Sequence, residues 1–227
     1  MKSPLRKRIP RELKGEFGKY LVVFLLMVLT IGFVSGFLVA DGSMLKAYDE
    51  SFDKYNIENG NFRTAEKVYR SQWKDIEAAG VKLYENYYIE EALDNGSTMR
   101  FFKNREQVNK VCLMKGEMPS EQGEIAIDRM YADNNSLQVG DTLTGGKKSW
   151  KITGLVALSD YSALFSNNGD MMFDAVKFGV AIVTEDGFDS FDSDTIRYNY
   201  AWKYDKAPKN DTKAKDMGTD LMEDVAT

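Results

Sequence analysis

The chain has 227 residues, is 43% hydrophobic and 29% charged, and has a formal net charge of -5 at pH 7, a composition typical of folded proteins rather than disordered or wholly membrane-embedded ones. It contains no histidine and one cysteine, which excludes histidine-based acid–base catalysis, an internal disulfide and imidazole or multi-thiolate metal centres. Because a nucleophilic cysteine would need a histidine partner, Cys112 is expected to be a small buried side chain in a strand.

The first predicted element is a transmembrane helix at residues 20–40. This segment carries no charged side chain, and about 20 apolar residues span the hydrocarbon core of a bilayer. Residues 1–19 form a basic flank, whereas acidic side chains outnumber basic ones from residue 41 onward. The positive-inside rule therefore predicts a cell (plasma) membrane protein with a cytoplasmic N-terminus and with residues 41–227 extracytoplasmic. A cleaved signal peptide is disfavoured, because its apolar core would be only about 7–15 residues long.

Two features near the membrane leave alternatives open. Gly32 and Gly36 form a GxxxG pair, which permits close packing against another membrane helix, although glycine is also common in membrane helices that lack such a role. The basic flank either lies along the inner membrane surface as an amphipathic stretch or is a flexible segment that only sets topology.

Residues 41–60 are predicted to form a helical stalk that continues the membrane helix. Its larger apolar side chains recur at the three-to-four spacing of one helix face. They are Met44, Leu45, Tyr48, Phe52 and Tyr55.

The extracytoplasmic domain is predicted at residues 61–227. After a short first strand, a helix is expected at 71–80 with Ser71 as its N-cap, followed by a strand at 81–93. The pair Asn95-Gly96 is expected to turn the chain into the next strand. This order of elements predicts an α+β fold, that is, a mixed α/β domain behind one N-terminal transmembrane helix.

Residues 115–156 predict a small curved β-barrel-like subdomain within that domain. A strand at 123–128 and a helical turn are followed by a turn at Gly140 and a tight hairpin at Gly145-Gly146. Short strands with glycine at their corners are typical of small barrels and sandwiches.

The remaining sequence is less regular. An apolar strand at 178–183 follows a polar loop that is flanked by large apolar side chains. These side chains are expected to be core residues at the feet of the loop, and an adaptable contact surface is the alternative. They are Tyr161, Leu164, Phe165, Met171, Met172 and Phe173. Residues 61–187 are predicted to be the better-defined part, and the more polar residues 188–227, with one strand and a helix-like tail, an incomplete second part.

Carboxylates are the remaining candidates for catalysis. A hydrolase could use two carboxylates as a pair, but those near the strand at 123–128 flank a turn, where charge usually serves solvation. They are Glu117, Glu121, Glu124 and Asp128. We expect no enzyme activity and assign no catalytic, cofactor-binding or metal-binding residue.

The acidic stretch Asp186–Asp194 is the remaining candidate for metal binding. It lacks the central glycine and the final glutamate of a calcium-binding loop, so a solvated loop is favoured and calcium binding is left open. A P-loop for nucleotide binding is missing from the sequence, and the acidic extracytoplasmic part argues against a nucleic-acid partner.

The order of the elements and one extended pattern resemble a known family. The stretch from Gly116 to Val156 is similar to the "G-x-x-P … G/N-E-I-A-I/L … A … L-x-V-G-D-x-L/I … Y/W-x-I-T-G-I/L-V" pattern of FtsX-like (MacB-type) ABC transporter permeases, which lies outside the cytoplasm after their first membrane helix. The matching residues are Gly116, Pro119, Gly123, Glu124, Ile125, Ala126, Ala132, Leu137, Val139, Gly140, Asp141, Trp150, Ile152, Thr153, Gly154 and Val156.

The resemblance implies a permease subunit without catalytic residues of its own. Its partners would be a cytoplasmic ATP-binding ABC subunit, a second permease copy or half, and membrane lipid. ATP hydrolysis by the partner would move the extracytoplasmic domain, for export or for mechanotransmission. The matched residues that would maintain the fold are Gly116, Pro119, Glu124, Gly140, Asp141 and Gly154.

The number of membrane helices departs from that family. Such permeases have at least four, so this chain is expected to be a fragment of a longer permease or a truncated product. The alternative function is that of a single-span, membrane-anchored extracytoplasmic binding or sensor module.

Overall fold

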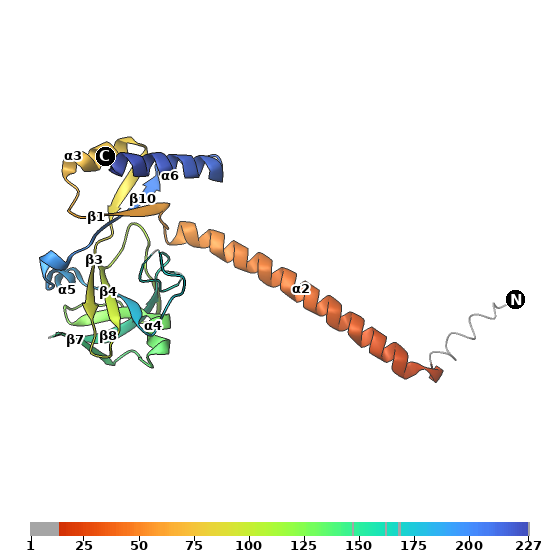
Figure 1. Ribbon diagram of the computed structural model, residues 1–227. Coiled ribbons are helices and arrows are strands. Elements are labelled where there is room, and N and C mark those ends of the chain that lie inside the picture. Colours follow the sequence, from red (N-terminus) through yellow and green to blue (C-terminus); the bar gives the residue numbers. More distant parts are fainter. Residues whose placement is uncertain (1–13, 147, 162, 168, 227) are drawn as a thin grey trace. The chain divides into compact units, whose positions relative to one another are not determined.

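The computed structural model describes residues 14–146, 148–161, 163–167 and 169–226 (Figure 1). The chain divides into two compact units after Glu50. The first unit consists mainly of helix α2 (Phe17–Lys54), whose last residues belong to the second unit. The second unit, Ser51–Thr227, contains the strands and the shorter helices.

Helix α2 is continuous through the predicted span and most of the predicted stalk. Among the described residues it is the one helix long and apolar enough to cross a membrane. None of its residues is buried against protein, as expected for a span whose partner is lipid or another helix. The helix ends at Lys54, within the predicted stalk at 41–60, because Asn56 adopts a left-handed backbone with φ 47°, which does not continue a helix.

A large mixed sheet forms the main part of the second unit. Its strand order is β3-β4-β9-β6-β8-β5, with β7 pairing to β8, and the pairs β4–β9 and β6–β8 are parallel. The strands are β3 (Tyr88–Ala92), β4 (Thr98–Lys103), β5 (Cys112–Gly116), β6 (Glu124–Asp128), β7 (Thr142–Gly145), β8 (Lys148–Ala157) and β9 (Phe178–Val183).

The large sheet curls into a half-barrel, as predicted for residues 115–156. Strand β8 pairs with β7 through its first half and with β5 through its second half. The register shifts between Ile125 and Ala126 on the β6 side and between Leu113 and Lys115 on the β5 side. Such bulges bend a strand and increase its local twist, so they account for the curl.

The core of the large sheet explains the apolar run at 178–183. Strand β9 lies inside the sheet between β4 and β6, and every one of its residues is buried, so both of its faces are covered. Strands that are covered on both faces read as continuous apolar runs rather than as alternating ones. Helix α4 (Arg129–Asn134) also packs on this core through the fully buried Tyr131 and Ala132.

A small antiparallel sheet forms the second layer. Its order is β1-β10-β2, made of β1 (Gly60–Thr64), β10 (Tyr198–Tyr204) and β2 (Val81–Glu85). Helices α3 (Arg70–Ala78) and α6 (Asp211–Ala226) lie together on one side of this sheet in Figure 1. A separate apolar cluster fills the space beneath them: Phe62, Ile76, Val81, Leu83, Tyr200, Trp202 and Leu221.

The strand predicted at 81–93 is in fact two strands in different sheets. Strand β2 belongs to the small sheet and β3 to the large one. Between them the Asn86 amide donates to the Asn199 carbonyl oxygen at 2.9 Å, and the Tyr87 ring packs against both apolar clusters. The alternating pattern continues through Asn86-Tyr87 because each sheet buries its own part of the run.

The predicted N-cap of the first short helix is also wrong. The N-cap of α3 is Tyr69, whose backbone amide donates to Gln72 Oε1 at 3.0 Å, and Ser71 lies exposed within the helix. Gly80, which follows the C-cap Ala79 of this helix, has φ 88°, a conformation that favours glycine just beyond a helix end.

The C-terminal region contributes to both layers. The strand predicted near 196–204 is β10, the middle strand of the small sheet, and the helix-like tail is α6. Strand β10 and helix α6 thus fold together with residues 60–85, from the start of the domain. Two short helices, α5 (Glu185–Asp189) and the 3-10 turn η1 (Ser193–Thr195), connect β9 to β10.

Candidate functional site

Two glycines of the family-like pattern face each other across β5 and β8. The Cα atoms of Gly116 and Gly154 are register partners. A Cβ on Gly116 would collide with the carbonyl oxygen of Thr153, and one on Gly154 would collide with that of Glu117. Gly116 also has φ 76°, a conformation that side chains rarely adopt. Both positions therefore require glycine for close backbone approach.

The acidic residues of the pattern stabilise turns by accepting hydrogen bonds from backbone amides. Glu124 Oε2 accepts hydrogen bonds from the backbone amide of Ser120 at 3.0 Å, from its hydroxyl at 3.1 Å and from the amide of Glu121 at 3.3 Å. These donors, the Ser120 amide first, lower the pKa of Glu124. Asp141 Oδ2 accepts from the Gln138 amide at 2.8 Å, beside Gly140 with φ 102°.

The other carboxylates considered for catalysis have different structural roles. Asp128 caps helix α4 by accepting from the amides of Met130 and Tyr131, and burial raises its pKa. Glu117 and Glu121 are exposed. Each engaged carboxylate therefore serves the backbone of its own turn or helix.

The acidic stretch 186–194 is divided between two short helices. Asp189 pairs with Lys103 Nζ at 2.9 Å, and Asp192 Oδ1 accepts from the Asp194 amide at 3.1 Å at the start of η1. Within the part of the chain that the structure describes, no three His, Cys, Asp or Glu side chains come together as a metal site.

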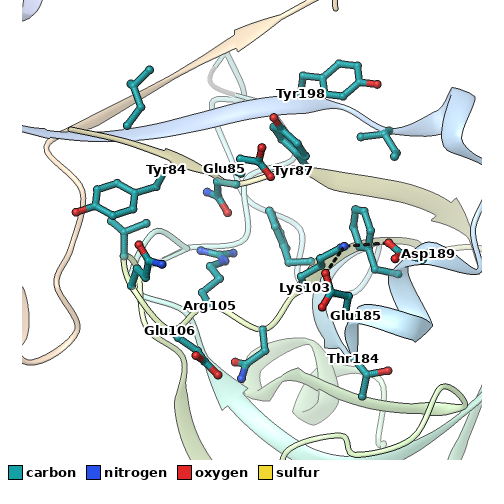
Figure 2. Close-up of a pocket in the computed structure, with 18 of the residues that line it drawn as sticks. Tyr84, Glu85, Tyr87, Lys103, Arg105, Glu106, Thr184, Glu185, Asp189 and Tyr198 are labelled. Atoms are coloured by element: carbon teal, nitrogen blue, oxygen red, sulfur yellow. Dashed lines mark hydrogen bonds and ion pairs between the residues drawn. The ribbon is translucent and has the colours of Figure 1, made fainter. Parts of the chain in front are cut away.

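An open cleft of about 1040 Å³ lies between the two sheets (Figure 2). Its walls come from β2, from the loop after β4, from α5 and from the start of β10. Tyr87 and Tyr198 meet edge to face with ring centroids 5.2 Å apart. At the opposite wall, Lys103 reaches both Glu185 and Asp189. Pro119 of the family-like pattern also lines this cleft.

A buried ion pair borders the cleft. Arg105 Nη1 donates to Asp160 Oδ2 at 2.6 Å, and both side chains are more than nine-tenths buried. The Arg105 guanidinium lies 4.2 Å from the centroid of the Phe102 ring. Arg105 Nε and Nη2 and Asp160 Oδ1 have no partner among the described protein atoms. No local sequence pattern points to this pair, since its members are 55 positions apart in ordinary polar surroundings.

The loop before β9 corrects one prediction. Met171 is 98% exposed and Met172 is 84% exposed, and Phe165 and Phe173 are also exposed, so these four are not core residues. Asp170 accepts hydrogen bonds from Ser166 and Asn167, which folds the loop on itself and leaves its apolar side chains outside. Leu164, by contrast, is buried as predicted.

The remaining candidate residues lie in different surroundings. Gly32 and Gly36 lie on α2, where a Cβ in place of the glycine hydrogen would meet no group outside the helix's own backbone within 4 Å. Cys112 is in β5, as predicted, but is only half-buried, and its Sγ accepts a hydrogen bond from the Tyr55 hydroxyl at 3.0 Å.

No family model matches the chain, and no curated protein matches it significantly. Solved structures do show similarity of fold. The periplasmic region of MacB from Actinobacillus actinomycetemcomitans is 11% identical, with a TM-score of 0.38, over 70% of this chain and 74% of that one. The extracellular domain of the ABC-type transporter YknZ from Gram-positive bacteria is 10% identical, with a TM-score of 0.36, over 74% and 94%.

Proposed function

We propose that this chain is the membrane helix and extracytoplasmic domain of a permease subunit of an FtsX/MacB-like ABC transporter. A cytoplasmic ATP-binding subunit would supply the energy, and movement of the extracytoplasmic domain would perform export or mechanotransmission. The observation that carries the proposal is that the permease-like pattern folds as one unit, β5-β6-α4-β7-β8, in a chain that also has a membrane-length apolar helix.

Acidic residues within the stretch from Gly116 to Val156 support a role without catalysis. Glu124, Asp128 and Asp141 each bind backbone amides, and the complete sequence has no histidine. A hydrolytic activity of the purified chain that Glu124→Gln alone abolished would overturn this part of the proposal.

The end of α2 is followed by a segment that could transmit force. The Lys110 amide donates to the Tyr55 carbonyl at 2.8 Å, and the Asn59 amide donates to the Trp202 carbonyl at 2.9 Å. This segment therefore binds both the loop that leads into β5 and the central strand of the small sheet. A displacement of the end of the helix would reach both sheets through backbone hydrogen bonds, which are short and directional.

Co-purification tests the proposal. The gene, with any downstream coding sequence, is expressed together with the neighbouring gene for a P-loop ATPase, and the tagged permease is purified from detergent-solubilised membranes. We expect a stoichiometric complex whose ATPase activity disappears when the P-loop lysine of the partner is replaced. A neighbourhood without an ATPase gene, or a chain that purifies alone, would contradict the permease function.

Topology gives a second readout. Single cysteines are placed at Ser3 and at Glu117 in a Cys112→Ser background, and intact cells are treated with a membrane-impermeant maleimide. We expect labelling at position 117 in intact cells, and at position 3 only after the membrane is opened. The reverse pattern would place the domain in the cytoplasm and exclude both proposed functions.

The cleft favours a second candidate, a single-span anchored binding or sensor module. Its aromatic wall includes Trp73 and Tyr87, and aromatic side chains with a few polar groups are typical of ligand sites. Saturable quenching of Trp73 fluorescence by a small ligand, in a chain that needs no ATPase partner, would favour this module over the permease.

A further inference from the structure

The segment from Tyr55 to Asn61 joins α2 to the rest of the second unit through a dense set of hydrogen bonds. Asn109 is the centre of this set. Its backbone amide donates to the backbone carbonyl of Asn56 at 3.1 Å, and its side-chain Oδ1 accepts from the backbone amide of Glu58 at 2.9 Å. Asn56 and Asn109 both have left-handed backbones, with φ 47° and 48°, which asparagine tolerates better than most residues. The segment is thus held in one defined conformation.

Glu58 is the only acidic side chain that the structure shows within these bonds. Its Oε2 accepts from Asn109 Nδ2 at 2.6 Å, and its Oε1 accepts from Asn61 Nδ2 at 2.5 Å. The same carboxyl therefore connects the segment both to the loop before β5 and to the first strand of the small sheet.

The charges around Glu58 oppose its ionisation. Burial first, and the charge of Asp160 second, raise the pKa of Glu58 to about 7, against the lowering effect of the Asn61 and Asn109 amides and of Arg105. Arg105 is itself paired to Asp160, so its charge is shared. Lys203 also contacts the segment, but it donates to Asn56 Oδ1 at 2.7 Å.

We propose that Glu58 is a proton-binding site that works as a latch between the end of α2 and the two sheets. With a proton on Glu58, the carboxyl is neutral beside Asp160 and the segment stays docked. Without the proton, a second negative charge lies in the same buried cluster, and the segment loosens from the loop at 105–110. The inference concerns this chain alone and stands whether or not an ATPase partner is found.

The direction of the pH dependence follows from the linkage between proton binding to Glu58 and docking of the segment. In the docked state the carboxyl holds its proton to a higher pH than it would in water, where its usual pKa is 4.5. Docking is therefore strongest below about pH 5, weakens as the pH rises through about 7, and then levels off. A shift of this size corresponds to a change in the opening equilibrium of the order of a hundredfold.

Hydrogen exchange of the full-length chain in detergent tests the latch. The reporters are the amides of Glu58, Asn109 and Lys110, with each rate divided by the intrinsic rate at that pH. We expect their protection to fall by about a hundredfold between pH 5 and pH 8, to be independent of pH in Glu58→Gln, and to fall as in the wild type in Glu106→Gln. Glu106 is an exposed carboxylate on the same loop, which makes it the matched control. Amides of β9 should show no such change.

A direct titration of the wild-type chain tests the proposal even if a variant does not fold. The carboxyl carbon of Glu58 in the wild-type chain should titrate near pH 7 by NMR. A midpoint near 4.5, protection that does not depend on pH in the wild type, or the same dependence in Glu58→Gln would each overturn the latch.

Discussion

Gly116 and Gly154 lie directly opposite each other on β5 and β8, and neither has room for a Cβ. The collisions would be with the carbonyl oxygens of Thr153 and Glu117, which are backbone atoms and cannot rotate away. The sequence pattern places both glycines 38 positions apart, and only the strand pairing shows that they form a single close approach at the bulged end of the half-barrel.

Gly154→Ala should destabilise the second unit by about 2–4 kcal/mol, because the strands must separate to admit the methyl group. Thermal unfolding followed by circular dichroism measures the change. The matched control is Gly123→Ala, in the same pattern, where a Cβ would meet nothing within 4 Å. That change should stay within about 0.5 kcal/mol, and equal effects at the two positions would contradict the close-approach argument.

Replacing one member of the buried Arg105–Asp160 pair should lower the free energy of unfolding more than replacing both members. Arg105→Met leaves Asp160 charged and buried, and we expect a loss of about 3 kcal/mol in unfolding free energy. The double variant Arg105→Met/Asp160→Leu should recover a large part of this loss. Urea unfolding of the single and double variants measures the difference, and a double variant that is less stable than the single one would refute the prediction.

Glu124→Gln should weaken the turn at Ser120–Gly123 in a pH-dependent way. The pKa of Glu124 is lowered in the folded state, chiefly by the Ser120 amide. Its contribution is therefore complete above the unfolded pKa of about 4.5 and is lost as the pH falls through the folded pKa. The melting temperature of the variant should lie below that of the wild type at pH 7, and the two should converge in acid. Glu121→Gln, which leaves the backbone amide donor in place, is the control and should have no such effect.

Met171 and Met172 should be the first methionines to oxidise. Both side chains are almost fully exposed, whereas Met99 is completely buried in the main core, and methionine oxidation follows exposure. Peptide mass spectrometry after mild hydrogen peroxide treatment should find sulfoxide at 171 and 172 well before 99. Early oxidation of Met99 would mean that the core opens readily.

Replacing Gly32 and Gly36 together with leucine should weaken association of α2 with other membrane helices, because GxxxG allows close helix approach. Cysteine crosslinking between spans in native membranes measures this association. Replacing Leu25 and Leu29 with alanine, at the same spacing about two turns earlier, is the control for a general change in the helix surface. Unchanged crosslinking in the glycine variant would show that the pair has no packing role.

The sequence by itself determined the features that depend on neighbouring residues. The apolar run of α2, the hairpin from β7 to β8 at Gly145-Gly146, and the strand and helical turn of β6 and α4 follow from spacing and turn chemistry within a few residues. Hydrophobic periodicity and glycine turns are local signals, and the structure agrees with each of these predictions.

Only the tertiary structure decided the features that depend on residues far apart. The apolar run at 81–93 divides between two sheets because β10, from the other end of the domain, pairs with β2. Met171 and Met172 are exposed, although their apolar composition suited the core. Glu58, Asn109 and Asp160 come from distant positions of the sequence and act on one another in the fold. Burial and strand pairing between distant segments leave no periodic signal in the sequence, so the charged and hydrogen-bonded sites that they create could not be predicted.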